Sequence, residues 1–289
     1  MHYEGALIRP PNEAESILLQ VTVGCSHNRC TFCGAYKHKV FRIKDSRTID
    51  NDIAYAARHF PDNKRLFLCD GDALILPQKQ LVALLDTIHA RLPGVQRIGI
   101  YANAKSISRK TVEELHDLKQ RGLSMVHMGL ESGDDPTLQS VDKWGSAAEI
   151  VAQGKKVKAA DIRLFTTVLL GLAGAERSHE HAVATGEALT AMNPQYVGAL
   201  SLMPVEGTPL YDRLKCGTFT LPDARTMLLE LRTMLAHTDL RPGMFYANHA
   251  SNYLPMKVRL PKEKLHALAL IDCACRGEVQ LTPEWLRGL

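Results

Sequence analysis

Three cysteines lie close together in the segment Val-Gly-Cys-Ser-His-Asn-Arg-Cys-Thr-Phe-Cys-Gly, which begins at Val23. They are Cys25, Cys30 and Cys33. Three thiolates on one loop can bind three irons of a [4Fe–4S] cluster and leave the fourth iron without a protein ligand. The amine and carboxylate of an amino acid can chelate such an open iron. A cluster of this kind could hold S-adenosylmethionine (SAM) and pass one electron to its sulfonium, and cleavage of the C–S bond would then release a 5′-deoxyadenosyl radical.

Zinc is the alternative occupant of these cysteines. A closed zinc site needs a fourth ligand, which His27 or His38 could supply. Zinc sites more often have two C-x₂-C halves, and this chain has one half only. The other four cysteines bring the total to seven, an odd number that does not predict a disulfide framework. We therefore favour iron and sulfide over zinc.

Apolar β-rich runs alternate with amphipathic helical runs along the chain. The predicted strands are 16–23, 65–69, 97–101, 125–130, 163–170 and 196–203. The predicted helices are 48–59, 77–91, 108–120, 146–159, 179–192, 222–237 and 262–273. This alternation predicts βαβ units and a parallel sheet. We expect an α/β fold, a full or partial (β/α)₆ TIM-like barrel over 1–240, with a C-terminal extension over 241–289 packed on it. Within that extension, 241–255 is predicted to be a long loop.

Polar and glycine-rich segments follow the predicted strands, at the end where barrel enzymes place their active sites. Gly71 would allow a close approach, and Asp70 or Asp72 could accept hydrogen bonds from an ammonium. Asn103 ends the third strand and could line the pocket. His127 has the same strand parity as Glu131, which predicts that it points inward, either as a satisfied core residue or toward the site.

The chain resembles the radical SAM superfamily, in the branch that contains oxygen-independent coproporphyrinogen oxidases and tRNA methylthiotransferases. The resemblance rests on C-x₄-C-x₂-C with Phe32 before the last cysteine, one residue longer than the usual C-x₃-C-x₂-C. Asp70-Gly71-Asp72 stands where the family has a glycine-rich stretch. Gly129-Leu130-Glu131-Ser132-Gly133 looks like the family's G-x-E-S-G segment. The resemblance implies a radical SAM barrel with a [4Fe–4S] cluster and SAM as cofactors.

The resemblance also implies roles for single residues. Cys25, Cys30 and Cys33 would hold the cluster and carry the catalysis. The SAM-binding residues would be Phe32, Asp70, Gly71, Asp72, Asn103, Glu131, Ser132, Leu170 and Met203. Each segment has a plainer interpretation as well: a capped turn at Asp72, a helix-starting carboxylate at Glu131, and strand-end turns at Leu170 and Met203.

Composition narrows the class of protein. The net charge is +4 and 45% of residues are hydrophobic, as in an ordinary globular protein. No secretory signal and no long apolar run is visible, so we expect a cytoplasmic protein without a membrane partner. The mild charge, with no recognisable cobalamin- or RNA-binding segment, favours a small-molecule substrate over nucleic acid. An external flavodoxin or ferredoxin would supply the electron. The alternatives are a radical SAM enzyme that modifies RNA or protein, and a non-catalytic iron–sulfur or zinc protein.

Overall fold

The computed structural model describes residues 1–288 and divides into two compact units. The first unit comprises Met1–Asn28, Ala35–Met128 and Lys156–Leu164. The second comprises Arg29–Gly34, Gly129–Lys155 and the described residues from Phe165 onward. The cysteine-rich loop therefore begins in the first unit and continues in the second.

Four parallel strands form the sheet of the first unit, in the order β1-β4-β5-β6. They are β1 (Ile17–Gln20), β4 (Arg65–Cys69), β5 (Arg97–Ala102) and β6 (Leu123–Glu131), the last of which ends in the second unit. Strands β2 (Thr22–Val23) and β3 (Arg42–Ile43) form a separate two-stranded antiparallel sheet. All four residues of β1 are buried, as in a parallel strand covered on both faces.

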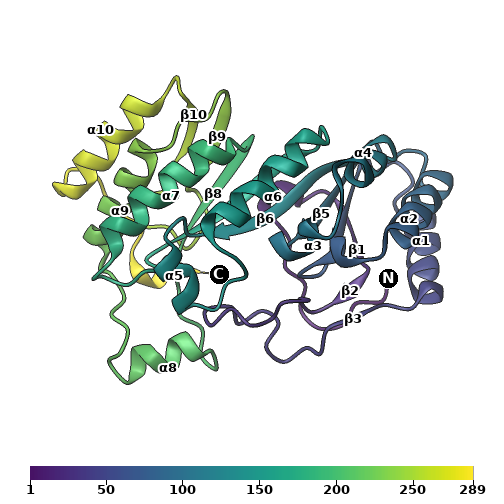
Figure 1. Ribbon diagram of the computed structural model, residues 1–289, viewed down its shortest axis with the longest axis horizontal. Helices are drawn as coiled ribbons and strands as arrows, with labels where there is room; N and C mark the ends of the chain where they lie inside the picture. Colours follow the sequence, from purple (N-terminus) through teal and green to yellow (C-terminus); the bar gives the residue numbers. More distant parts are fainter. Residues whose placement is uncertain (289) are drawn as a thin grey trace. The chain divides into compact units, whose positions relative to one another are not determined.

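The helices of the first unit are α1 (Ser46–His59), α2 (Gln78–Arg91), α3 (Ala104–Ser108) and α4 (Val112–Gln120), with 3₁₀ turns η1 (Pro11–Glu13) and η2 (Ala73–Ile75). Figure 1 shows α1 and α2 side by side near β1. Local sequence starts these helices: Asp45 accepts from the Thr48 N–H, and Thr111 and Glu114 form a reciprocal capping box. Helices α1 and α4 thus begin at residues that accept from a free backbone N–H, whereas α2 follows Pro77 without a side-chain cap.

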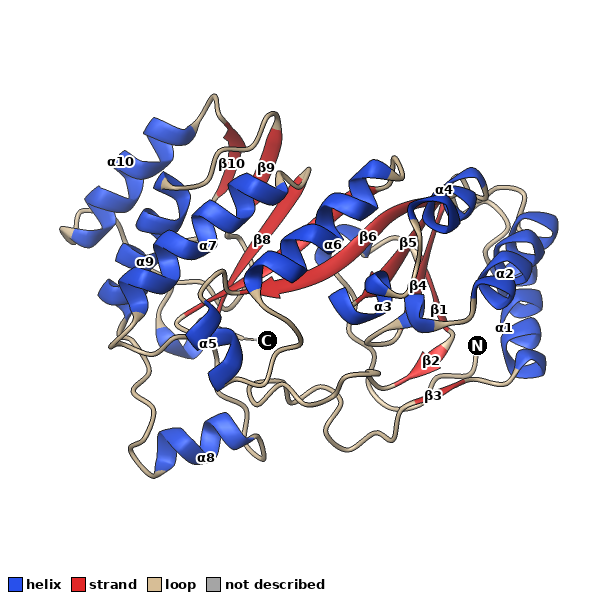
Figure 2. Ribbon diagram, viewed as in Figure 1, coloured by secondary structure: helices blue, strands red, loops and turns tan. Residues whose placement is uncertain are grey.

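Four strands in the order β7-β8-β9-β10 form the sheet of the second unit, and only the β9–β10 pair is antiparallel. They are β7 (Arg163–Leu170), which starts in the first unit, β8 (Tyr196–Ser201), β9 (Gly243–Tyr246) and β10 (Lys257–Leu260). The helices are α5 (Asp135–Ser140), α6 (Ala147–Ala159), which ends in the first unit, α7 (Ser178–Met192), α8 (Pro209–Lys215), α9 (Ala224–Ala236) and α10 (Lys264–Cys275), with the turn η3 (Glu284–Leu286). Figure 2 shows α7, α9 and α10 as neighbouring helices over these strands.

The two faces of β7 differ in burial. Its even-numbered residues from Leu164 to Leu170 are buried, whereas the odd-numbered residues from Phe165 to Leu169 are half-buried. Because successive strand side chains point to opposite faces, Leu169 and Leu170 face different surroundings. This alternation decides which of them packs against helix α9.

The predicted α/β fold is confirmed, in its partial-barrel form, because β1 and β10 each pair with one neighbouring strand only. Several details differ from the prediction. The expected strand 16–23 is divided into β1 and β2. The expected helix 108–120 begins later, as α4 at Val112, and the short helix α3 (Ala104–Ser108) precedes it. The segment predicted as a loop contains β9, which pairs with β8. Residues 241–288 add β9, β10 and α10 to the second unit; the boundary at residue 240 stays a prediction.

No helix within residues 1–288 has the length and apolar character that crossing a bilayer requires. The cytoplasmic location stays a prediction.

Candidate active site

Cys25, Cys30 and Cys33 lie on the loop that follows β2, and all three are partly exposed. None of them forms a disulfide. Cys25 belongs to the first unit, and Cys30 and Cys33 to the second. Within residues 1–288, no three or more His, Cys, Asp or Glu side chains are grouped closely enough to hold a metal ion. The donor set, three accessible thiols on one loop, has the chemistry that an iron–sulfur cluster needs. Cluster ligation by these residues stays a prediction.

The Arg29–Gly34 part of this loop is anchored to the second unit by its backbone. The Thr31 N–H donates to the Val141 carbonyl at 2.9 Å, and the Thr31 carbonyl accepts from the Leu210 N–H at 3.1 Å. Phe32 packs against an apolar cluster that includes Val141 and Leu210, and Leu169 packs on the same cluster. The backbone around Phe32 is therefore fixed beside the end of β7.

The start of the loop is fixed in the first unit by Asp70. Gly24, at φ +77°, donates its N–H to Asp70 Oδ2 at 3.0 Å. Lys39 Nζ lies 3.0 Å from the same oxygen, and the Asp70 side chain is fully buried. The second oxygen, Oδ1, is buried with no hydrogen-bond partner in the described part of the chain. A buried carboxylate oxygen without a donor is costly, so Asp70 can accept one more hydrogen bond.

Gly71 lies against the cysteine loop. A Cβ atom at this position would lie 2.9 Å from Cys25 Cβ and 2.7 Å from the ring of Tyr36. Any side chain at Gly71 would therefore push on the loop that carries the first cysteine. This packing is a reason for glycine at position 71, and the close approach of SAM to it stays a prediction.

Asp72 holds a second point of the loop. Its carboxylate accepts from the Ser26 hydroxyl and from Asn103 Nδ2, the latter at 2.9 Å. Asn103 also caps α3, with Oδ1 accepting from the Ser106 N–H at 2.8 Å. Burial raises the pKa of Asp72 from its ordinary 3.8 to about 6, although these hydrogen bonds oppose the shift. Asp72 and Asn103 thus contact the loop, and their predicted SAM contact stays a prediction.

Glu131 ends β6 in the left-handed region, at φ +65°. Its carboxylate folds back over Gly129, where a Cβ would lie 1.9 Å from Oε1. The same oxygen accepts from Lys143 Nζ at 2.9 Å, and both side chains are about nine-tenths buried. A positive φ at a residue other than glycine is strained and is retained where surrounding contacts require it. The pair presents one carboxylate and one ammonium beside the strand end.

Ser132 directs its hydroxyl into the protein interior, 2.7 Å from His181 Nδ1. His127 is also buried, with Nε2 3.8 Å from Glu13 Oε1 and its ring edge-on to Phe67. Burial lowers the pKa of His127. The structure therefore places His127 in the core of the first unit, between Glu13 and Phe67.

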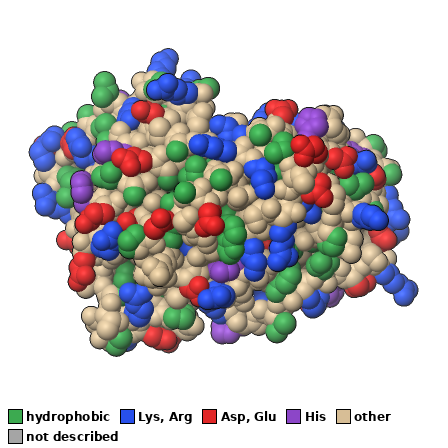
Figure 3. All heavy atoms as spheres, in the orientation of Figure 1, with side chains coloured by type: hydrophobic (Ala, Val, Ile, Leu, Met, Phe, Trp, Pro, Cys, Tyr) green, Lys and Arg blue, Asp and Glu red, His purple; other side chains and the backbone are tan. Residues whose placement is uncertain are grey.

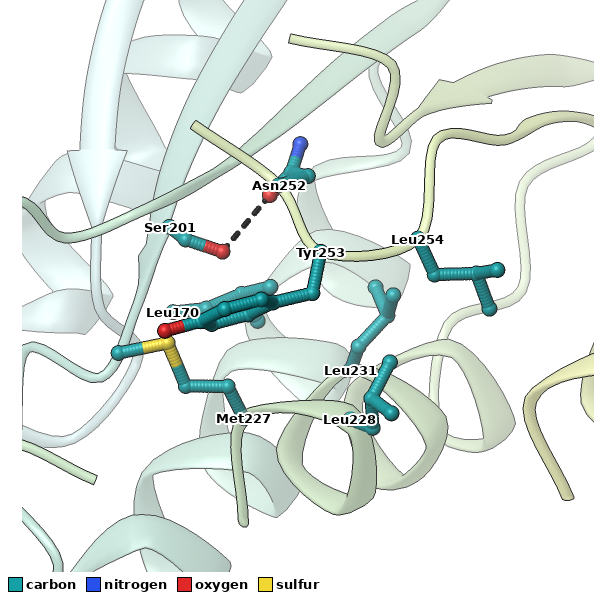
Figure 4. Close-up of a pocket in the computed structure, with 8 residues that line it drawn as sticks. All are labelled: Leu170, Ser201, Met227, Leu228, Leu231, Asn252, Tyr253 and Leu254. Atoms are coloured by element: carbon teal, nitrogen blue, oxygen red, sulfur yellow. Dashed lines mark hydrogen bonds between the residues drawn. The ribbon is translucent and has the colours of Figure 1, made fainter. Parts of the chain in front are cut away.

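Leu170 lines a small pocket, which Figure 4 shows. Met227 and Leu231 from α9 and Tyr253 from the loop between β9 and β10 line the same pocket. The cavity volume is about 10 Å³, far below that of typical ligand sites. Leu170 therefore faces α9, whereas Leu169 packs against the same apolar cluster as Phe32. Met203 follows β8 and is half-buried.

The loop between β9 and β10 is hydrogen-bonded to the end of β8. Ser251 Oγ accepts from the Ser201 N–H at 3.1 Å, and Asn252 Oδ1 accepts from the Ser201 hydroxyl at 2.9 Å. Asn252 Nδ2 donates to the Ala199 carbonyl at 2.9 Å. Ser251 and Asn252 are buried in these contacts, whereas Asn248 in the same loop is exposed.

Five residues with clear positions around these segments were not predicted from the sequence: Ser26, Lys39, Lys143, His181 and Glu230. Lys39 and Ser26 could have been found, because both lie within or just after the cysteine loop. Lys143 follows Glu131 by twelve positions, and His181 and Glu230 lie on separate helices, so no local spacing connects them.

Comparison with known proteins identifies the class. The family model of the radical SAM superfamily matches residues 19–184, more than half of the chain. The chain therefore belongs to the radical SAM superfamily, as the cysteine motif predicted. Enzymes of this superfamily use a [4Fe–4S] cluster and SAM, and they need an electron donor.

Individual similarities are more distant. The heme chaperone HemW of Bacillus subtilis (strain 168) is 23% identical over 164 residues, covering 56% of this chain and 42% of HemW. Coproporphyrinogen III oxidase (HemN) from Escherichia coli, described as a radical SAM enzyme, superposes with a TM-score of 0.57 at 15% identity, over 76% of this chain and 51% of HemN. Methylornithine synthase (PylB) gives 0.55 at 15% identity, over 78% and 63%. The chain thus spans less than two thirds of each, and the two structural likenesses establish the fold.

Proposed function

We propose that this protein reductively cleaves SAM at a [4Fe–4S] cluster held by Cys25, Cys30 and Cys33 and acts on a small-molecule substrate. When bound, the cluster would supply one electron to the sulfonium and release a 5′-deoxyadenosyl radical that abstracts hydrogen from the substrate. The single observation that carries the proposal is the loop of three accessible thiols in a chain that belongs to the radical SAM superfamily.

The protein's own residues would bind and orient SAM. Asp70 Oδ1, buried and without a donor, can accept a hydrogen bond from the methionyl ammonium. Glu131 can accept from a ribose hydroxyl or from that ammonium, and Lys143 holds its carboxylate in place. Gly71 gives the room for a close approach to Cys25. Phe32 and the end of β7 offer backbone and apolar surface to the adenine.

Asp72 and Asn103 would act on the loop. Through Ser26 they hold the residue that directly follows Cys25, and so limit how far the first thiol can move. Met203, half-buried after β8, would face SAM or substrate. Holding reacting groups in one geometry and keeping water from a reactive intermediate are the usual contributions of the protein to such chemistry.

The substrate class rests on surface charge. The net charge is only +4, and Figure 3 shows acidic and basic side chains interspersed over the face in view. Binding to a nucleic acid relies on clustered Lys and Arg side chains. This supports a small molecule over an RNA, with a flavodoxin or ferredoxin as the electron donor.

The test is anaerobic reconstitution with iron and sulfide, reduction in the presence of SAM, and measurement of 5′-deoxyadenosine. Wild type should form the product, and Cys30→Ala should not. Cys216→Ala is the matched control, because Cys216 is exposed at the end of α8, and it should match wild type. A cluster-loaded wild type that forms no 5′-deoxyadenosine would refute the proposal and favour a non-catalytic iron–sulfur protein.

A further inference from the structure

Two buried side chains connect the ends of strands β6 and β7. His181 lies on α7 and Glu230 on α9, and the side chains of both are fully buried. Neither belongs to a segment predicted to contact SAM. Buried polar groups of this kind are retained only when their hydrogen bonds are satisfied, and a fully satisfied network fixes one arrangement of the chain around it.

The first connection reaches the end of β6. His181 Nδ1 lies 2.7 Å from the Ser132 hydroxyl, which also accepts from the Asp134 N–H at 2.9 Å. The Gly133 N–H donates to Thr185 Oγ1 at 2.8 Å, one helical turn along α7 from His181. The residues directly after Glu131 are therefore held to α7 by both side chain and backbone.

The second connection reaches the end of β7. His181 Nε2 lies 3.1 Å from the Leu169 carbonyl and 3.4 Å from Glu230 Oε1. Glu230 in turn accepts from the Gly171 N–H at 2.5 Å. Since Nε2 faces two acceptors, it carries the hydrogen, and Nδ1 accepts from Ser132. One imidazole thus joins two strand ends, and Glu230 holds the turn that follows the second.

We propose that His181 and Glu230 are positioning residues that hold the β6 end and the β7 end in register, so that Glu131 and the Leu169–Gly171 backbone meet SAM together. This inference deepens the proposed function and rests on it. Neither residue touches the reacting groups. Their effect passes through Ser132 on one side and through Leu169 and Gly171 on the other.

Two substitutions of His181 separate the two connections. His181→Gln places its amide near the Nε2 position and keeps the bonds to the β7 end, whereas His181→Asn places its amide near Nδ1 and keeps the bond to Ser132. His179→Gln is the control, at an exposed position on the same helix. Glu230→Gln keeps the shape of the side chain and serves as a second route if the His181 variants do not fold.

Hydrogen exchange in the full chain without SAM gives the first readout. His181→Gln should accelerate exchange in residues 131–134 about tenfold and leave 169–171 unchanged, because one buried hydrogen bond is lost at one end only. His181→Asn and Glu230→Gln should do the reverse. Exchange that rises equally in both segments, or in neither, would overturn the proposal.

SAM affinity of the reconstituted protein gives the second readout. All three variants should bind SAM about tenfold more weakly than wild type at equal cluster content, and His179→Gln should match wild type. Variants that bind SAM as tightly as wild type would overturn the positioning role. A wild type that binds no SAM would instead refute the proposed function, while the exchange pattern would still decide whether His181 connects the two strand ends.

Discussion

The substitution Asp72→Asn tests how the cysteine loop is held in place. Asp72 accepts a hydrogen bond from Ser26 of that loop, and it is a buried acid whose pKa is raised. The unfolded chain ionises this carboxyl near its ordinary pKa of 3.8, and the folded chain only near about 6. Protonation of Asp72 therefore adds to the free energy of unfolding. This stabilisation is fully present below about pH 3.8 and is lost as the pH rises through about 6. Above that range, the ionised carboxylate costs the folded state about 3 kcal/mol, at 1.36 kcal/mol per pH unit of difference.

The assay is the free energy of unfolding of the purified protein in urea, measured from about pH 4.5 to about pH 7.5. Over this range the wild type should gain about 2 kcal/mol relative to Asp72→Asn as the pH falls, since most of the ionisation penalty disappears. All other titrating groups are shared, so the difference isolates Asp72. Asp62→Asn, at an exposed position, is the matched control. Parallel curves for wild type and Asp72→Asn would refute the reasoning.

Three further substitutions test the contacts around the site. Gly71→Ala should destabilise the protein by about 1–3 kcal/mol and lower its cluster content, because the added Cβ overlaps the ring of Tyr36; a variant with normal iron content and unfolding curve would contradict this. Lys39→Met should cost about 3 kcal/mol in the urea assay, because it leaves the Asp70 carboxylate buried without its cation. Adding Asp70→Asn should recover part of that loss, and a purely additive result would count against the ion pair. Glu131→Gln should weaken SAM binding about tenfold in equilibrium dialysis of folded protein at equal cluster content; equal affinity would exclude its proposed contact.

Much of the fold could be predicted because parallel strands have a strong local signature. The β4 run Arg65–Cys69 is apolar and short, and the structure has it with the predicted bounds. The missed features depend on contacts distant in sequence. Val21 separates β1 from β2, and its N–H bonds to the Cys69 carbonyl, which no local pattern records. β9 has only four residues and becomes a strand by pairing with β8.

The later start of the predicted helix 108–120 had a local signal that was missed. Thr111 with Glu114 three positions later is a capping-box sequence, and the structure starts α4 directly after Thr111. Such a box marks a helix start, so a continuous helix through Thr111 was the weaker interpretation.

The candidate site could be predicted only to the level of strand ends. Asp70, Asn103 and Glu131 were predicted from their places at strand ends, with the family resemblance also pointing to Asp70 and Glu131, and their contacts with SAM stay predictions. The side-chain pairings around these segments could not be predicted, because Ser26 reaches Asp72 across 46 positions and Ser132 reaches His181 across 49. The direction of each side chain, such as that of Ser132 toward His181, could not be predicted from strand positions.

The central claim is that Cys25, Cys30 and Cys33 hold a cluster whose fourth iron is open to SAM. Its most direct test is the electron paramagnetic resonance spectrum of the reduced, reconstituted protein, recorded with and without SAM. We expect wild type and Cys216→Ala to give a [4Fe–4S] signal that changes when SAM is added. This signal should be lost in Cys30→Ala. A cluster signal that SAM leaves unchanged, or a protein that takes up zinc and no iron, would contradict it.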